Sequence, residues 1–164
     1  MNNNTEKNLS TLVEEIYQTV SDLNSGDKDI PEEDLETLTV GIKKSISNWA
    51  RPKNKNGFSI RMSNIGKPTR QLYYNKKYPS DSTHDAPTLI KFLYGHILEE
   101  VLLFLVKLSG NDVTDQQKEV TVNGVTGHLD CKINGEVVDV KTASNFAFRK
   151  LKTVRLGKMI RSDT

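Results

Sequence analysis

Residues 126–144 read T-G-H-L-D-C-K-I-N-G-E-V-V-D-V-K-T-A-S, and this stretch decides the fold that the sequence predicts. Its centre, Asn134-Gly135, is a typical two-residue hairpin turn between two short, largely apolar segments. A two-residue turn sets the register of the two strands, and that register places Asp130 opposite Asp139. The stretch therefore predicts an antiparallel β-hairpin whose paired strands carry acidic side chains.

The two faces of this hairpin differ in chemistry, because side chains along a strand alternate between the faces. One face is apolar and should belong to the core; it carries Leu129, Cys131, Ile133, Val138 and Val140. The other face carries His128, Asp130, Asp139 and Lys141.

On the polar face, Asp130 and Asp139 should lie with their Cβ atoms about 5 Å apart, where two like charges destabilise a strand pair. A divalent cation would neutralise them, and carboxylate and water oxygens suit Mg²⁺ or Mn²⁺. Lys141 beside such a metal would orient a water and stabilise charge developing on a phosphate. The alternative is a solvent-facing hairpin surface of mixed charge.

Around the hairpin, apolar spacing predicts helices over residues 10–23, 31–50, 68–74 and 87–108. Strands are expected over residues 117–122, 127–133 and 136–142, and a final helix near Ser144. The order of helices, a meander and a helix favours an α/β or α+β fold over a helical bundle.

Charge is distributed unevenly along the 164 residues, with ten acids and two bases in residues 1–40. Residues 51–77 carry eight bases and no acid, and residues 149–161 carry six bases and no acid. Such one-sided blocks point to an anionic partner, usually nucleic acid, although a solvated loop has the same composition. A single cysteine, Cys131, excludes an internal disulfide framework and fits a reducing cytosol. Neither a signal peptide nor a membrane-spanning segment is expected.

Three motifs together resemble the PD-(D/E)XK nuclease superfamily, and within it the RecB-type and phage exonuclease-like group. They are Y-G-H-I-L-E-E on the residue 87–108 helix, then Gly127-His128-Leu129-Asp130, then Asp139-Val140-Lys141. Upstream, the run S-N-I-G-K-P-T-R-Q-L-Y-Y, which starts at Ser63, resembles the segment that precedes the core in many of these nucleases. Lys67 or Pro68 stands where some relatives carry an iron–sulfur cysteine, so no cluster is expected.

The resemblance implies a restriction-endonuclease-like core, a small mixed sheet flanked by helices, and metal-dependent cleavage of DNA, linear or single-stranded, in recombination or repair. It implies that Mg²⁺ or Mn²⁺ is held by His96, Asp130, Asp139 and the carbonyl of Val140. Lys141 would position the attacking water, and Glu100 or Glu99 would assist. A core histidine is the alternative for His96. The expected compartment is the cytoplasm, or the host cytoplasm if the chain is phage-encoded.

Five residues are candidates for holding the nucleic-acid strand, by phosphate contact or base stacking: Arg61, Lys67, Arg70, Tyr73 and Tyr74. The alternative for the tyrosines is packing within their helix. His128 would contact a phosphate or lie on the strand surface.

The chain departs from the family after the third motif, where relatives carry a further helix with a Q-x-x-x-Y pattern. We therefore expect a helical extension over residues 1–50 and a nuclease-like domain over residues 51–164, truncated at its C-terminus. The tail after about residue 150 is basic and aperiodic, and a frameshift is one hypothesis for it. Two other functions stay open: a nucleic-acid-binding fragment without cleavage, and a structural protein whose acidic N-terminal half docks a partner.

Overall fold

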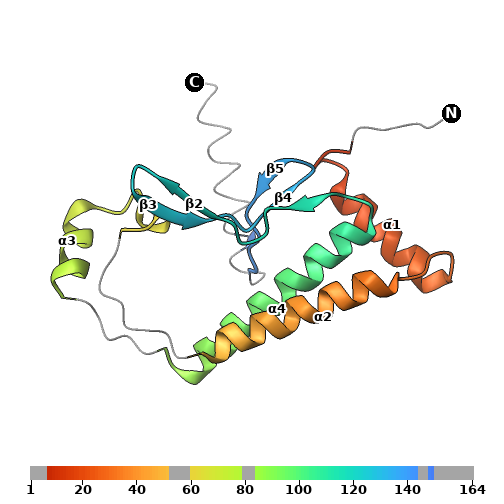
Figure 1. Cartoon of the computed structure of the whole chain (residues 1–164), viewed down its shortest axis with the longest axis horizontal. Coiled ribbons are helices and arrows are strands. Elements are labelled where there is room, and N and C mark those ends of the chain that lie inside the picture. Colours follow the sequence, from red (N-terminus) through yellow and green to blue (C-terminus); the bar gives the residue numbers. More distant parts are fainter. Residues whose placement is uncertain (1–6, 52–59, 79–83, 144–147, 150–164) are drawn as a thin grey trace.

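Four α-helices and two small antiparallel sheets make up the described part of the fold, shown as a computed structural model in Figure 1. The structure describes residues 7–51, 60–78, 84–143 and 148–149. The helices are α1 (Leu12–Ser25), α2 (Glu32–Ala50), α3 (Thr69–Lys77) and α4 (Ala86–Leu108), with a short 3₁₀ turn η1 (Met62–Asn64) before α3. The strands are β1 (Val113–Thr114), β2 (Glu119–Val122), β3 (Val125–His128), β4 (Cys131–Ile133) and β5 (Glu136–Val138). The prediction of a mixed α and β fold is confirmed.

Both sheets are antiparallel, with strand orders β1-β4-β5 and β2-β3. The prediction of a small mixed sheet is therefore wrong for the described part of the chain. A parallel contact occurs as an isolated bridge between Arg61 and Thr126. There, Met62 packs on Gly127, where an added Cβ would lie 2.8 Å from the methionine side chain.

The predicted register of the decisive hairpin is confirmed, with Cys131 paired to Val138 and Ile133 to Glu136. The turn residues Asn134 and Gly135 have φ values of 50° and 84°. These left-handed conformations match the twist of adjacent strands, and they explain why asparagine and glycine occupy the turn. Asn123-Gly124 closes the β2–β3 hairpin in the same way, with Val122 paired to Val125.

The strand predicted over residues 127–133 is divided at Leu129-Asp130, because the chain changes partner there. The Leu129 N–H donates to the Lys118 carbonyl, and the Gln117 N–H donates to the Asp130 carbonyl, both at 2.9 Å. Beyond this point the chain pairs with β1 and β5 instead. Strand β1 was not predicted, since two residues are too few to show a periodicity.

The core lies where the C-terminal half of α4 meets the β1-β4-β5 sheet. Its buried residues are Leu103 and Val106 from α4 with Cys131 and Ile133 from β4. Packed against them are Leu9, Leu12, Ile16, Val113, Val138 and Val140. Four of the five residues predicted for the apolar hairpin face thus lie in or against the core, while Leu129 is half-buried and lies outside the core cluster.

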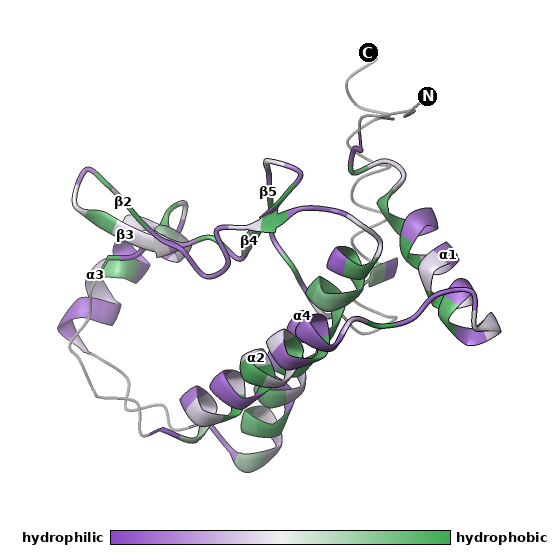
Figure 2. Ribbon diagram, turned by 45° about the vertical axis from the view of Figure 1, so that its right-hand side comes forward, coloured by the Kyte–Doolittle hydropathy of each residue, from purple (hydrophilic) through white to green (hydrophobic). Residues whose placement is uncertain are grey.

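Helices α1 and α2 both pack on α4, and α2 runs beside α4 (Figure 1). One apolar stripe of α4 is nevertheless less covered than predicted. Its apolar side chains Ile90, Tyr94 and Leu98 are exposed, with Tyr94 at 62%. Figure 2 shows the hydrophobic colour along much of this helix. The stripe continues to Leu102, which is 40% exposed, whereas the buried residues Leu103 and Val106 belong to the core cluster with β4.

The predicted helix near Ser144, the basic tail, and part of the basic block of residues 51–77 lie wholly or partly outside the described residues. The proposed division of the chain at residue 50 stays a prediction. Within the described part of the chain, no helix combines the length and apolar character that crossing a membrane requires.

Candidate functional site

The hairpin brings together three of the residues predicted for chemistry. Asp130 directly precedes β4. The strand predicted over residues 136–142 ends at Val138, so Asp139 and Lys141 follow β5 and do not lie within it. The Lys141 ammonium lies 2.6 Å from Asp139 Oδ1 and 3.7 Å from Asp130 Oδ2. The backbone N–H of Val140 donates to Asp130 Oδ2 at 2.9 Å, which orients that carboxylate. The polar cluster Asp130–Asp139–Lys141 therefore forms just beyond the last strand pair, Cys131 with Val138, and not within the paired strands.

The protonation states in this cluster follow from its hydrogen bonds. The hydrogen bond from Lys141 lowers the pKa of Asp139, and a side-chain hydrogen bond with Asp130 contributes in the same direction. The hydrogen bond to Asp139 in turn raises the pKa of Lys141. Both directions keep the lysine charged at neutral pH. The side chains of Lys141 and Asp139 are 72% and 67% exposed, so their ion pair contributes little stability.

The full predicted metal-ligand set is not assembled. Among the described residues, no group of three histidine, cysteine, aspartate or glutamate side chains is placed to hold a metal ion. His96 is exposed on α4, so it is not the core histidine considered as the alternative. Lys141 contacts both Asp139 and Asp130, at 2.6 Å and 3.7 Å. Carboxylate oxygens are the donor type that Mg²⁺ and Mn²⁺ prefer, so Asp130 and Asp139 match these cations in chemistry.

The two glutamates of Y-G-H-I-L-E-E face different partners. Glu100 accepts a hydrogen bond from Ser45 Oγ of α2 at 3.1 Å, and a Cβ added at Gly41 would lie 2.5 Å from Glu100 Oε2. Glu99 instead accepts from Gln117 Nε2 at 2.8 Å. Burial raises the pKa of Glu99, and the nearby charge of Asp130 raises it further. Of the two predicted helpers, Glu99 is thus the one electrostatically coupled to the hairpin cluster.

The end of the hairpin runs against α4 at Gly95, where an added Cβ would lie 3.6 Å from Thr142 Oγ1. This contact places the helix segment that carries His96 and Glu99 beside the strand end that follows Lys141. His128, at the end of β3, is exposed and lies 3.7 Å from Glu119.

The residues predicted to bind a nucleic-acid strand lie on α3 and in the segment before it. The Arg70 guanidinium lies 5.7 Å from the Tyr74 ring centroid, and the rings of Tyr74 and Tyr78 stack at 6.1 Å with an interplanar angle of 17°. Lys77 lies over Tyr73 and Tyr78, at 5.8 Å and 5.5 Å. Lys77 and Tyr78 were missed, although their spacing of four from Tyr73 and Tyr74 was a usable signal.

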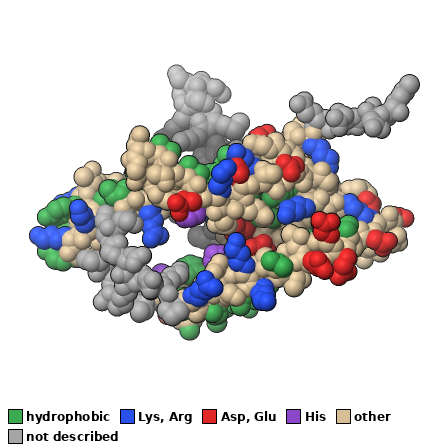
Figure 3. Space-filling view, viewed as in Figure 1, with side chains coloured by type: hydrophobic (Ala, Val, Ile, Leu, Met, Phe, Trp, Pro, Cys, Tyr) green, Lys and Arg blue, Asp and Glu red, His purple; other side chains and the backbone are tan. Residues whose placement is uncertain are grey.

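The other two predicted residues, Lys67 and Arg61, contact neighbouring parts of the same chain. Lys67 donates to Asn64 Oδ1 at 3.2 Å, and Arg61 joins the bridge to Thr126. Figure 3 shows lysine and arginine side chains at the α3 end of the molecule, whereas acidic side chains gather over α1 and the start of α2. The aromatic–basic surface of α3 is hereafter the group Arg70, Tyr73, Tyr74, Lys77 and Tyr78.

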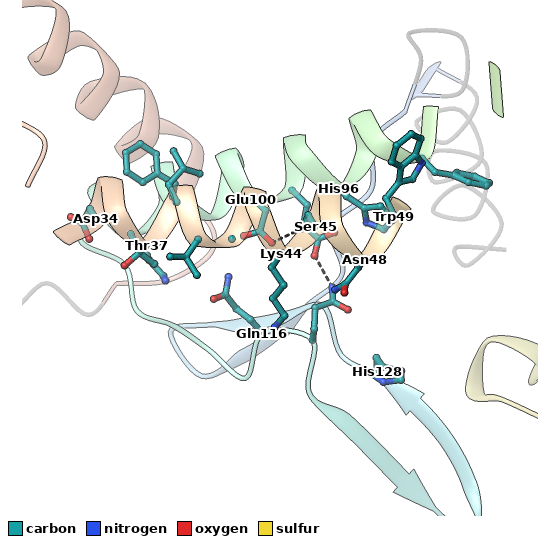
Figure 4. A pocket seen from close by; sticks show the side chains of 18 of the residues that line it. Asp34, Thr37, Lys44, Ser45, Asn48, Trp49, His96, Glu100, Gln116 and His128 are labelled. Carbon is teal, nitrogen blue, oxygen red and sulfur yellow. Dashed lines mark hydrogen bonds between the residues drawn. The ribbon is translucent and has the colours of Figure 1, made fainter. Parts of the chain in front are cut away.

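A cavity of about 650 Å³ lies between α2, α4 and the strands (Figure 4). His96, Glu99 and Glu100 line it from α4, while Lys44 and Trp49 line it from α2. Asp130, Asp139 and Lys141 are not among its lining residues. The contribution of α2 was not predicted, because helical periodicity shows which face is apolar but not which helix it meets.

Comparisons of the chain with protein-family models, with curated proteins and with solved structures gave no match.

Proposed function

We propose that the chain is a metal-dependent DNA nuclease of the PD-(D/E)XK type, with an exonuclease-like activity on a restriction-endonuclease-like core. The observation that carries the proposal is the Asp130–Asp139–Lys141 cluster, with the lysine ammonium 2.6 Å and 3.7 Å from the two carboxylates. The resemblance of the three sequence motifs supports it further.

The residues that would hold the metal are Asp130 and Asp139, with His96 and the Val140 carbonyl as the further predicted ligands. When bound, a divalent cation supplies a nucleophilic water and stabilises charge on the phosphate. The Val140 N–H keeps the Asp130 carboxylate oriented. Because its pKa is raised, Lys141 stays protonated, so it acts by orienting water and stabilising negative charge rather than by accepting a proton.

The test is cleavage of linear DNA in Mg²⁺ or Mn²⁺ by the wild type and Lys141→Ala. We expect the substitution to reduce the rate by about 100-fold to 10,000-fold. Lys132→Ala is the matched control, because Lys132 lies on the same hairpin but pairs with Asp115 at 2.8 Å. Lys132→Ala should retain cleavage. Equal rates for the wild type and Lys141→Ala, or cleavage that persists in a chelator, would contradict the proposal.

A second candidate function is binding of nucleic acid without cleavage. The aromatic–basic surface of α3 favours it, since exposed tyrosines beside cations bind single strands by stacking and charge. This function predicts salt-sensitive DNA binding that needs no divalent cation, with no cleavage under any metal condition.

A further inference from the structure

The cavity between α2 and α4 has walls that are fixed by hydrogen bonds between the two helices. Trp49 Nε1 donates to the Leu89 carbonyl at 2.8 Å, and Ser45 Oγ donates to Glu100 Oε1 at 3.1 Å. Its volume of about 650 Å³ lies within the range of small-molecule sites.

The lining of the cavity combines three kinds of side chain that recognise nucleotides. Trp49 and Phe92 are aromatic, Asn48 and Gln116 carry carboxamides, and Lys44 is a cation. Aromatic rings stack with bases, carboxamides hydrogen-bond to base edges, and lysine contacts phosphate. Figure 4 shows Asn48, Trp49 and His96 grouped at one end, His128 across from them, and Lys44 extending from α2 toward the strand side.

The cavity also adjoins the hairpin cluster. Gln117 and Glu99 both line it and are joined by a hydrogen bond of 2.8 Å. The Gln117 backbone N–H donates to the Asp130 carbonyl at 2.9 Å. A single residue, Gln117, would therefore separate a ligand in the cavity from Asp130, the aspartate that the proposed nuclease uses.

We propose that this cavity binds the terminal nucleotide of a DNA strand, with the base near Trp49 and the phosphate near Lys44. The proposal rests on the nuclease function and gives it a preference for strand ends. It also makes α2 part of the substrate site, rather than scaffold alone.

The chain carries a single tryptophan, Trp49, so its fluorescence reports directly on the cavity. The probe is deoxyadenosine 5′-monophosphate, titrated into the full chain without divalent cation. We expect saturable quenching, and a dissociation constant raised about 10-fold in Lys44→Ala by removal of a charged contact. Lys43→Ala is the matched control, because Lys43 is the neighbouring exposed lysine of α2 and does not line the cavity.

Asn48→Ala is a second variant, expected to weaken binding of both the nucleotide and the nucleoside deoxyadenosine. Lys44→Ala should weaken only the nucleotide. Absence of quenching at millimolar nucleotide, or equal effects of Lys44→Ala and Lys43→Ala, overturns the strand-end site even if linear DNA is cleaved. Conversely, nucleotide binding that responds to Lys44→Ala, in a chain that cleaves no DNA, overturns the nuclease function and leaves the cavity as a nucleotide site.

Discussion

The β4–β5 hairpin and helix α3 carry the two groups of predicted functional residues, and they hold them in different ways. The hairpin is anchored on the core through Cys131 and Ile133, which are 0% and 3% exposed. Helix α3 has no buried residue, and its rings and cations are arranged mainly by contact with one another. Chemistry on a phosphate needs groups at fixed distances, which the hairpin provides. Binding a flexible strand needs exposed rings and charges, which α3 provides.

The largest expected effect comes from loosening the anchored region. Ile133→Ala removes a buried side chain from the core and should cost about 2–5 kcal/mol of unfolding free energy. Because Ile133 lies three residues from Asp130, cleavage should fall with stability. Urea unfolding followed by Trp49 fluorescence measures the first effect.

The matched variant in the other region is Tyr73→Ala, since Tyr73 is 57% exposed. Its unfolding free energy should change by no more than about 0.5 kcal/mol. Lys141→Ala should likewise leave stability nearly unchanged, which separates its loss of cleavage from misfolding. Equal destabilisation by Ile133→Ala and Tyr73→Ala would break the distinction between an anchored hairpin and a self-arranged helix.

Much of this distinction was visible in the sequence. The Asn134-Gly135 turn sets the register, so the meeting of Asp130, Asp139 and Lys141 followed from counting along two strands. The sequence did not show whether Glu99 or Glu100 faces the hairpin. Adjacent helical residues point about 100° apart, so the docking of α4 decides which of the two does. That docking depends on Thr142 against Gly95 and on α2 against Glu100, which are long-range contacts without a local pattern.

The exposed apolar stripe of α4 was also unpredictable for a physical reason. A helical apolar stripe shows that a face can be buried, but not that a partner element reaches it. Leu98 and Leu103 lie on different sides of the helix and are 54% and 3% exposed, while Leu102, on the same stripe as Leu98, is 40% exposed. Among the described residues, the core cluster takes in Leu103 and Val106 of α4 but not Leu98 or Leu102.

An intermediate effect is expected from the charge of α3. The double substitution Arg70→Ala with Lys77→Ala removes two cations beside the tyrosine rings. For single-stranded DNA, the slope of log affinity against log salt should fall by about 1.4, or ~0.7 for each phosphate that the variant no longer neutralises. Binding titrations at several salt concentrations measure this slope.

The control for α3 is the double substitution Arg70→Lys with Lys77→Arg, which keeps both charges and should keep the slope. If cleavage occurs, the alanine variant should raise KM without lowering kcat, since these residues lie outside the hairpin cluster. A fall in kcat with KM unchanged would mean that α3 takes part in the chemical step, and it would contradict the proposal that α3 only binds the DNA strand.

The smallest expected effect is the pH dependence contributed by Glu99 and Asp139. The folded-state pKa of Glu99 is raised by burial and by Asp130, so the folded chain binds this proton more tightly than the unfolded chain. Stability from this group is therefore present at low pH and lost as pH rises from the ordinary glutamate pKa through the raised value. Glu99→Gln should remove that loss, making the chain relatively more stable at pH 7 than at pH 4.

Asp139 has the opposite sign, because Lys141 lowers its pKa in the folded chain. Its contribution is present above the ordinary aspartate pKa and is lost as pH falls through the lowered value, so Asp139→Asn should flatten the acid side of the stability profile. Helix α3 contains no carboxylate and should be insensitive to the same titration. Urea unfolding between pH 3 and pH 7 compares the two variants. If the two substitutions change the pH dependence of the unfolding free energy in opposite directions, the coupling of Glu99 to the hairpin cluster is supported. A Glu99→Gln variant that loses stability mainly at pH 7 contradicts it.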